Sequence, residues 1–119
     1  MPWDYYYKNE ASKYNFIRIP KALMTEEHFA SLSLQAKILY GLLLDRMSEA
    51  IKNEWIDEKD QVYVIYPIAD VMENMGVSKG KAIATMAELV TVGLIEKQQQ
   101  GQGLPSRIYI KNFVIEEEM

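Results

Sequence analysis

The sequence contains no cysteine and a single histidine, His28. Without cysteine the chain has no disulfide, no thiolate zinc site and no cysteine nucleophile. The neighbours of His28, Glu26 and Glu27, do not stand at metal-ligand spacing on a helix, so we interpret His28 as a surface residue. The sequence also lacks a glycine-rich phosphate loop, a nucleophile elbow and a Ser/His/Asp set. We therefore predict no catalytic residue, no metal site and no cofactor, and expect that the protein is not an enzyme.

Long hydrophobic runs are absent as well. The longest strongly apolar run, residues 38–44, is far shorter than the roughly 20 residues of a membrane-spanning helix. The N-terminus lacks the apolar stretch of a signal peptide. The acidic stretch at residues 57–60 lacks the glycine and the distal glutamate of a calcium loop, so we interpret it as a solvated turn. We expect a soluble, cytoplasmic protein that does not associate with membranes.

An overall excess of basic residues, which is typical of nucleic-acid-binding proteins, is missing too, because the net charge is −4. The charges are nevertheless unevenly distributed. Residues 78–111 carry five basic and two acidic residues, a net charge of +3, whereas residues 1–77 carry −4. Salt screens acids that lie more than about 10 Å away, so the positive segment can attract phosphate locally. Ordinary scatter of charge is the alternative interpretation.

The organisation along the chain predicts three parts. Residues 1–24 form an arm rich in aromatic side chains, which ends in the alternating sequence of residues 16–20, typical of a short strand stopped by proline. Residues 25–115 form one domain, and residues 116–119 form an acidic tail that we interpret as the start of a linker. The tyrosine-rich arm needs a surface to pack on, either in its own domain or in a second subunit.

Within residues 25–115, the periodicity of the apolar residues predicts three long helices and three strands. In chain order they are a helix from Ser33 to Met47, a strand at residues 62–66, helices at residues 68–75 and 78–92, and strands at residues 94–98 and 107–110. The last two helices are joined by a tight turn that contains Gly76, and a hairpin with a glycine-rich tip follows them. This order predicts the α+β class and a winged helix-turn-helix fold with an N-terminal arm or strand.

In such a fold the second helix of the motif enters the major groove of duplex DNA with its N-terminal residues. Ile83, Met86, Ala87 and Val90 follow helical spacing, and we place this set toward the core. That orientation turns Ser78, Lys81, Thr85 and Glu88 outward. Lys79 can reach a flanking phosphate, and Ser78 can cap the helix or bind a phosphate. Lys81 and Thr85 are the predicted base contacts. The alternative is that Ser78 only caps and that Lys79, Lys81 and Thr85 are solvated surface residues.

The hairpin supplies further candidates for contacts with DNA. Lys97 and Arg107 can hold phosphate, and Gln99 and Gln102 can hydrogen-bond to phosphate or to groove edges. Charged contacts dominate affinity, so Lys97 and Arg107 are the stronger candidates. A solvated hairpin without DNA contact is the alternative.

The chain also resembles the N-terminal domain of the replication initiator A family, which initiates the replication of plasmids in Gram-positive bacteria. The run Ala36–Arg46 and the run Asn53–Asp57 are together the specific part of this resemblance. The resemblance covers roughly residues 13–114, and its stretches are residues 14–21, 32–46, 53–57, 62–66, 78–82, 93–97 and 101–113.

The resemblance implies that a dimeric N-terminal domain binds double-stranded DNA at repeated sites of a plasmid replication origin. It implies that the N-terminal arm and the first long helix supply the homodimer contacts. It also implies a longer protein, whose C-terminal domain engages host replication proteins. The hairpin departs from the family in carrying glutamines at residues 98–100, where relatives tend to have arginine and lysine. This departure argues against strong binding of phosphate by the wing and predicts weaker or more salt-sensitive affinity for the isolated domain.

Two other functions remain open at this point. A winged-helix transcriptional regulator would use residues 78–111 in the same way. A winged-helix module that binds another protein would account for the net charge of −4.

Overall fold

The computed structural model describes residues 3, 5–7 and 15–112 of the chain. The acidic tail predicted at residues 116–119 and much of the aromatic arm lie outside the described residues. The helices are α1 (Ala22–Thr25), η2 (Glu27–Phe29), α2 (Leu34–Arg46), η3 (Met47–Glu49), α3 (Ile68–Met75) and α4 (Lys79–Val92), and the strands are β1 (Ile95–Gln98) and β2 (Arg107–Ile110). None of the helices in this part of the chain is long and apolar enough to cross a membrane.

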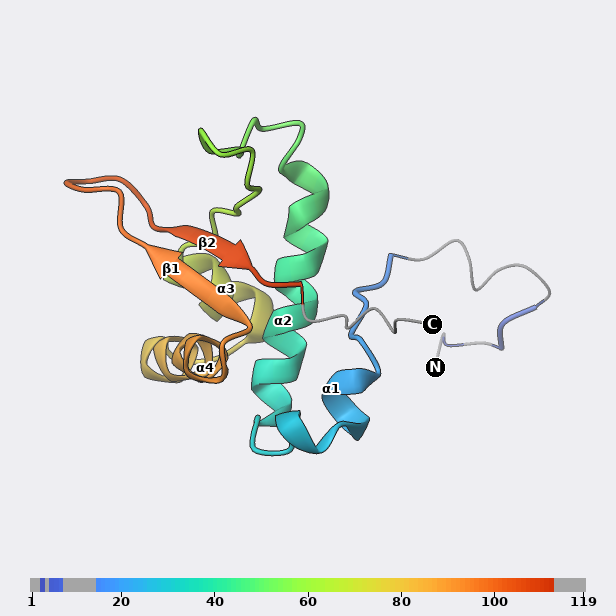
Figure 1. Ribbon diagram of the computed structural model, residues 1–119. Coiled ribbons are helices and arrows are strands. Elements are labelled where there is room, and N and C mark those ends of the chain that lie inside the picture. Colours follow the sequence, from blue (N-terminus) through green and yellow to red (C-terminus); the bar gives the residue numbers. More distant parts are fainter. Residues whose placement is uncertain (1–2, 4, 8–14, 113–119) are drawn as a thin grey trace, which may run out of the picture.

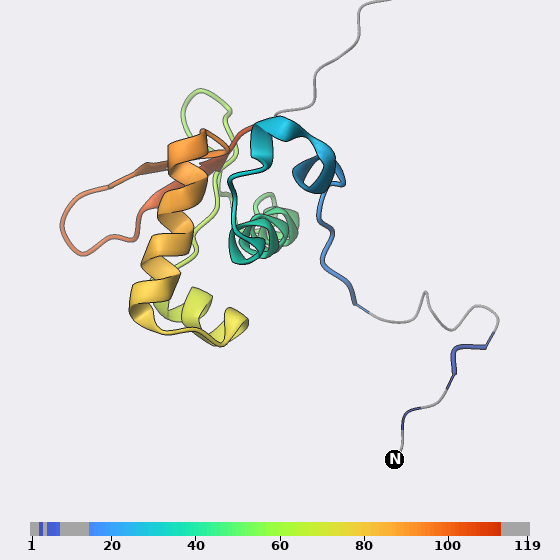
Figure 2. The same cartoon turned by 90° about the horizontal axis from the view of Figure 1, so that it is seen from below.

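The helices pack around α2, and the β1–β2 hairpin covers one side of them (Figure 1). Seen from below, the hairpin projects to one side of the helices and the N-terminal segment leaves on the other (Figure 2). The core lies between α2, α3, α4 and the inner face of the hairpin, where Leu39, Val71, Leu89 and Ile108 are buried together. The structure thus has the predicted order of a winged helix-turn-helix.

The long helix begins where the sequence predicts. Ser33 is its N-cap, and the Ser33 side chain accepts a hydrogen bond from the Ala36 amide. Leu39 and Leu43 are fully buried, but Leu34 and Ile38 on this helix remain exposed. One face of α2 therefore joins the core, and an apolar strip of the same helix stays on the surface.

The strand predicted at residues 62–66 is reduced to bridges. Val62 pairs with Ile56, and Val64 pairs with Ile108, with which it exchanges two backbone hydrogen bonds of 2.8 and 2.9 Å. Val64 thereby adds a short third segment beside β2. The Tyr63 amide donates to the Trp55 carbonyl oxygen at 3.1 Å, and residues 62–66 form no continuous ladder.

The strand predicted within residues 16–20 is wrong. Residues 15–20 have no strand structure, because an alternating segment becomes a strand only when another strand pairs with it. The segment lies against α2 instead. A Cβ atom at Gly41 would come within 2.9 Å of Ile19 Cγ1 and 3.1 Å of the Arg18 carbonyl oxygen. Glycine at position 41 therefore permits a close approach of this segment, and with Leu23 fully buried the packed domain begins before residue 25.

Candidate nucleic-acid interface

The helix-turn-helix unit is formed by α3, a three-residue turn and α4. Gly76 ends α3 in the left-handed conformation, with φ of 66°, and its amide donates to the Met72 carbonyl oxygen. Ser78 then caps α4 by accepting a hydrogen bond from the Lys81 amide at 3.2 Å. The predicted turn and the predicted cap are both confirmed. The Ser78 hydroxyl still has its own hydrogen to donate to a ligand.

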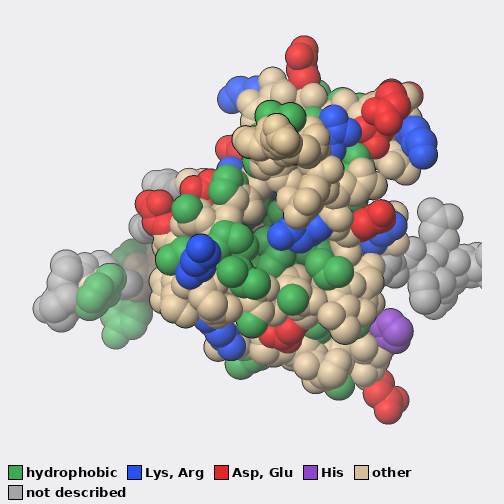
Figure 3. Space-filling view, turned by 90° about the vertical axis from the view of Figure 1, so that its left-hand side faces the viewer, with side chains coloured by type: hydrophobic (Ala, Val, Ile, Leu, Met, Phe, Trp, Pro, Cys, Tyr) green, Lys and Arg blue, Asp and Glu red, His purple; other side chains and the backbone are tan. Residues whose placement is uncertain are grey.

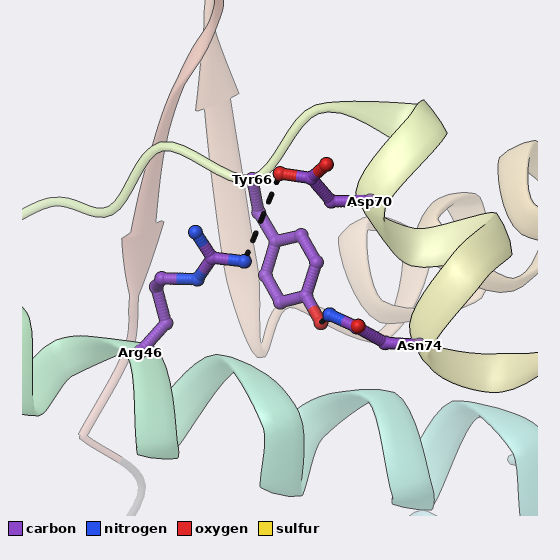
Figure 4. A network of polar contacts seen from close by, with 4 residues as sticks. All are labelled: Arg46, Tyr66, Asp70 and Asn74. Atoms are coloured by element: carbon purple, nitrogen blue, oxygen red, sulfur yellow. Dashed lines mark hydrogen bonds and ion pairs between the residues drawn. The ribbon is translucent and has the colours of Figure 1, made fainter.

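A polar cluster fixes the start of this unit on the long helix (Figure 4). The Arg46 guanidinium, from the end of α2, lies over the Tyr66 ring at 4.2 Å from its centroid and within 3.8 Å of the Asp70 carboxylate. At the hydroxyl end of the ring, the Asn74 amide donates to the Tyr66 hydroxyl at 2.6 Å. Asp70 and Asn74 both belong to α3, so these contacts set the position of α3 relative to α2.

The orientation predicted for α4 is wrong by one residue. The buried residues are Ala82, Thr85, Met86 and Leu89, whereas Ile83 and Val90 are 48% and 42% exposed. A shift of one residue turns a helix by about 100°. The predicted face had the more hydrophobic side chains, but the core accepts the small Ala82 and Thr85 because α4 packs against both α2 and α3.

This rotation removes Thr85 from the site. Its side chain is 0% exposed, and its hydroxyl donates to the Lys81 carbonyl oxygen at 2.7 Å. A threonine that bonds back to the preceding turn can be buried at low cost, because its polar group is satisfied within the helix. The predicted base contact of Thr85 is therefore wrong, and its side chain belongs to the core.

The acidic residue of α4 is bound to the start of α2. Glu88 accepts a hydrogen bond from the Ser33 amide at 2.8 Å and another from the Ser33 hydroxyl at 2.7 Å. These two hydrogen bonds hold the pKa of Glu88 below its ordinary value. The pairing spans 55 residues of sequence, so no local pattern could have revealed it. It links α4 to α2 and turns the carboxylate away from the outward face of α4.

We expect Glu88→Gln to destabilise the fold by about 1–2 kcal/mol at pH 7, because a charge-assisted hydrogen-bonded pair is weakened at a partly exposed position. A lowered pKa means that the ionised form stabilises the folded state above the ordinary pKa of a glutamate. That contribution disappears as the pH falls through the lower pKa of the folded state. Urea unfolding of wild type and variant from pH 7 to pH 3 measures this: their difference in stability should shrink on acidification.

The matched control is Glu73→Gln, which removes a charge from an exposed position of α3. It should unfold at the wild-type urea concentration at pH 7. A Glu88→Gln protein as stable as wild type at pH 7 would show that the Ser33 contact does not hold the helices together.

Two lysines flank the outward face of α4. Lys79 and Lys81 are exposed in the first turn of the helix, and at 100° per residue they lie on opposite sides of the outward direction. Gly80, Ile83, Ala84 and Ala87 lie between them and are exposed as well. Both lysines remain available to phosphate, next to the N-terminal amides of the helix.

The strand register places Lys97 on the face of the hairpin that packs against the helices. Lys97 pairs with Ile108, and Ile95 pairs with Ile110. Residues that pair across two strands share a face of the sheet, and so do alternate residues of one strand. Ile95 and Ile108 are buried in the core, so this face packs on the helices, while the Lys97 side chain beyond them is exposed.

Arg107 lies on the opposite face of the hairpin. It pairs with Gln98, and its guanidinium lies over the Tyr63 ring at 4.6 Å from the centroid. Its Nε donates to Gln100 Oε1 at 3.0 Å, while Gln100 Nε2 donates to the Pro105 carbonyl oxygen at 2.7 Å. The structure therefore does not bring Arg107 together with the α4 lysines, and its guanidinium holds the shape of the wing. Gln99 and Gln102 are exposed near the tip, and their contact with DNA stays a prediction.

The acidic stretch at residues 57–60 forms a turn that packs against the face of the hairpin that carries Arg107 and Tyr109. Asp57 Oδ1 accepts from the amides of Lys59 and Gln61, and Asp57 Oδ2 accepts from the Tyr109 hydroxyl at 2.9 Å. Partial desolvation raises the pKa of Asp57, but these hydrogen bonds outweigh it and leave the pKa below its ordinary value. The interpretation of this stretch as a turn is confirmed, because the Asp57 carboxylate accepts hydrogen bonds from backbone amides of the turn and from the Tyr109 hydroxyl.

The face that carries α4 and the wing tip is shown in space-filling form in Figure 3. Hydrophobic side chains gather across its middle, with lysine or arginine side chains at their edges. Most of the acidic side chains visible in this view lie in its upper part. In this view, most of the acidic side chains of the described residues therefore lie away from the hydrophobic middle of the face.

Three solved structures are similar to this chain over most of its length. The "N-Terminal domain of DNA binding protein" superposes with a TM-score of 0.79 at 31% sequence identity, covering 96% of this chain and 87% of that one. The "Structure of Rep-DNA complex" gives a TM-score of 0.79 at 31% identity, with 96% and 88% covered. The "Structure of MDR initiator" gives 0.76 at 29% identity, with 96% and 90% covered.

A curated relative, the "41 kDa protein" of Lactobacillus helveticus, is 32% identical over 101 residues. The match covers 80% of this chain, which spans only 29% of that relative's length. Residues 15–119 match the family described as "Replication initiator protein A (RepA) N-terminus". The match covers most of the chain and agrees with the winged-helix architecture, so the chain belongs to the family of replication initiator protein A N-terminal domains.

Proposed function

We propose that this chain binds double-stranded DNA with the first turn of α4 in the major groove and the wing beside it. The observation that carries the proposal is the placement of Lys79 and Lys81 in the first turn of a capped, outward-facing helix, with Lys97 on the helix side of the hairpin. Cations in this arrangement can neutralise phosphates on both sides of a groove. The similarity to a Rep–DNA complex supports this assignment.

The proposed target is a plasmid replication origin, where the chain acts as the N-terminal domain of a replication initiator. Membership of the replication initiator A family supports this role. The domain would place the initiator on origin repeats by binding alone, without catalysing a reaction, in the cytoplasm where plasmid DNA replicates. Contacts with host replication proteins would be made by a further C-terminal domain, which is in line with the much greater length of the curated relative.

We also propose that the domain binds DNA as a homodimer through its N-terminal segment and α2. Leu34 and Ile38 are 63% and 41% exposed on α2, and Phe16 is 61% exposed in the segment that packs beside this helix at Gly41. Leu34, Ile38 and Gly41 follow i, i+4 and i+7 spacing, so they share one face of the helix. An apolar strip of this kind is suited to contact with a second copy.

Footprinting with the purified chain on the origin of its own plasmid tests the assignment. Protection of repeated sites within the origin, and not of promoter fragments of equal length, is the expected result. Protection of promoters alone would favour a transcriptional regulator. The absence of protection on both DNAs, with a folded protein, would favour a module that binds another protein.

A further inference from the structure

The outward face of α4 carries apolar side chains where a groove-binding helix is expected to carry hydrogen-bonding ones. Ile83 is 48% exposed on the side of this face nearer Lys79, and Ala84 and Ala87 are exposed near its centre. The buried Thr85 hydroxyl donates to the Lys81 carbonyl oxygen, and Glu88 is bound to Ser33. In its first two turns, the face of α4 between the flanking lysines therefore offers DNA no side chain that can hydrogen-bond to a base edge. The exposed Thr91 lies on the same face, about three turns beyond Gly80.

An apolar side chain can distinguish bases in the major groove in one way. Thymine carries a C5 methyl group there, whereas the other distinguishing groups of the four base pairs are hydrogen-bond donors and acceptors. Burial of a methyl group against an isoleucine or an alanine is favourable, and burial of a base donor or acceptor against them is costly. The chemistry of this face thus matches thymine and disfavours bases that need a polar partner.

Gly80, in the first turn of α4, indicates that DNA comes close to the helix there. A Cβ atom at Gly80 would meet nothing within 4 Å, so the packing of the domain itself does not require glycine there. Glycine within a helix costs roughly 0.5–1 kcal/mol relative to alanine. Because Gly80 lies on the outward face next to Ala84 and Ile83, its lack of a side chain leaves room for the edge of the DNA.

The flanking charges favour DNA over a second copy of the chain as the occupant of this face. Two copies that met through it would bring two Lys79 and two Lys81 side chains close together, with Glu88 of each helix already bound to Ser33. Duplex DNA instead places phosphates on both sides of the groove, where the lysines lie.

We propose that Ile83, with Ala84 and Ala87 beside it, contacts thymine C5 methyl groups, so that the bound site carries thymine opposite the first two turns of α4. This inference rests on the proposed DNA-binding function and adds to it the base that is read and the residue that reads it. Ile83 is a specificity-determining residue in this account, and the two lysines supply affinity through phosphate. The base contact predicted for Lys81 stays a prediction.

The test replaces thymine by uracil, which removes the methyl group and keeps every hydrogen-bonding group. A bound duplex is first selected from a library of random duplexes with the full chain, and its thymines are then replaced one at a time. At one or more positions uracil should weaken binding by wild type about fourfold, the value expected for burying one methyl-sized group. Fluorescence anisotropy at fixed salt measures each affinity.

Three variants make the result specific to Ile83. Ile83→Ala should bind the thymine and uracil duplexes alike at that position, and Ile83→Val, which keeps a branched side chain, should retain part of the preference. Val90→Ala is the matched control, because Val90 is 42% exposed on the same side of α4 but lies two turns further along, about 10 Å away. It should keep the wild-type preference. Circular dichroism checks that all three variants fold.

The possible failures can be told apart. If wild type binds the selected duplex but never distinguishes uracil from thymine, the methyl contact is refuted and the proposed function stands. If Ile83→Ala keeps the full preference, another residue reads the methyl group and the assignment of Ile83 is overturned. If Ile83→Ala changes the sedimentation mass of the free protein without changing the preference, the face is a contact between copies of the chain. If no duplex is selected, the proposed function itself fails.

Discussion

Reversing the charges of Lys79 and Lys81 together is expected to weaken binding to the selected duplex on the order of a hundredfold. Both lysines are exposed in the first turn of α4, where the N-terminal amides of the helix also favour an anion. Two glutamates at these positions would remove two phosphate contacts and add repulsion close to the DNA backbone. Electrophoretic mobility shift at physiological salt measures the loss.

The matched control is the double variant Lys21→Glu/Lys52→Glu. It makes the same change in net charge at two exposed lysines outside α4 and the hairpin. Because salt screens charges beyond about 10 Å, its affinity should fall by no more than a few fold. Equal losses in the two double variants would mean that net charge alone governs binding and that α4 has no special place in it.

Gly41→Val is expected to destabilise the domain by about 2–3 kcal/mol, in the range typical of overpacking. A Cβ atom at this position already lies 3.1 Å from the Arg18 carbonyl oxygen, a backbone atom that moves only if residues 17–19 move. The two additional methyl groups of valine would push this segment off α2. Urea unfolding measures the loss, and limited proteolysis should cut the N-terminal segment of the variant sooner than that of wild type.

Gly80→Val makes the same substitution in a helix where a Cβ atom has open space. Valine and glycine differ little in helix propensity, so its stability should stay within about 0.5 kcal/mol of wild type. A Gly41→Val protein as stable as Gly80→Val would contradict the packing described for residues 17–19. The proposed dimer contacts lie beside the same segment, so Gly41→Val is also expected to weaken self-association.

The elements that the sequence predicts correctly are those determined by local chemistry. Ser33 and Ser78 cap helices because each presents a side-chain oxygen to a free amide, and Gly76 ends α3 because it adopts a positive φ without strain. The apolar spacing of α3 is unambiguous, and Ile68, Val71, Met72 and Met75 all pack on the core. These features require no knowledge of distant parts of the chain.

The orientation of α4 could not be predicted in this way. Hydrophobicity favours Ile83 and Val90 over Ala82 and Thr85, but the close packing of α4 on its neighbours admits the smaller pair. The link between α4 and α2 was not predictable either, because Glu88 and Ser33 are 55 residues apart in the sequence. The exposed isoleucine is informative for this reason, since the domain leaves it outside at a position that faces the proposed groove.

The candidate site on the wing was only half predictable. The sequence places Lys97 and Arg107 on neighbouring strands and makes them look equivalent. The register puts them on opposite faces, and Tyr63 then takes the Arg107 guanidinium. Which strand residue faces the helices depends on the pairing of Lys97 with Ile108, which composition does not reveal.

The most direct test of the account is the salt dependence of duplex binding by the wild-type chain. Fluorescence anisotropy with the selected duplex, from 50 to 300 mM salt, gives the slope of log affinity against log salt concentration. Contacts from Lys79, Lys81 and Lys97 predict a slope of about −3 for each bound domain. The slope should become shallower by about one in Lys97→Ala and should not change in Arg107→Ala. Binding that does not depend on salt, or no binding to duplex DNA by the folded chain, would contradict the account.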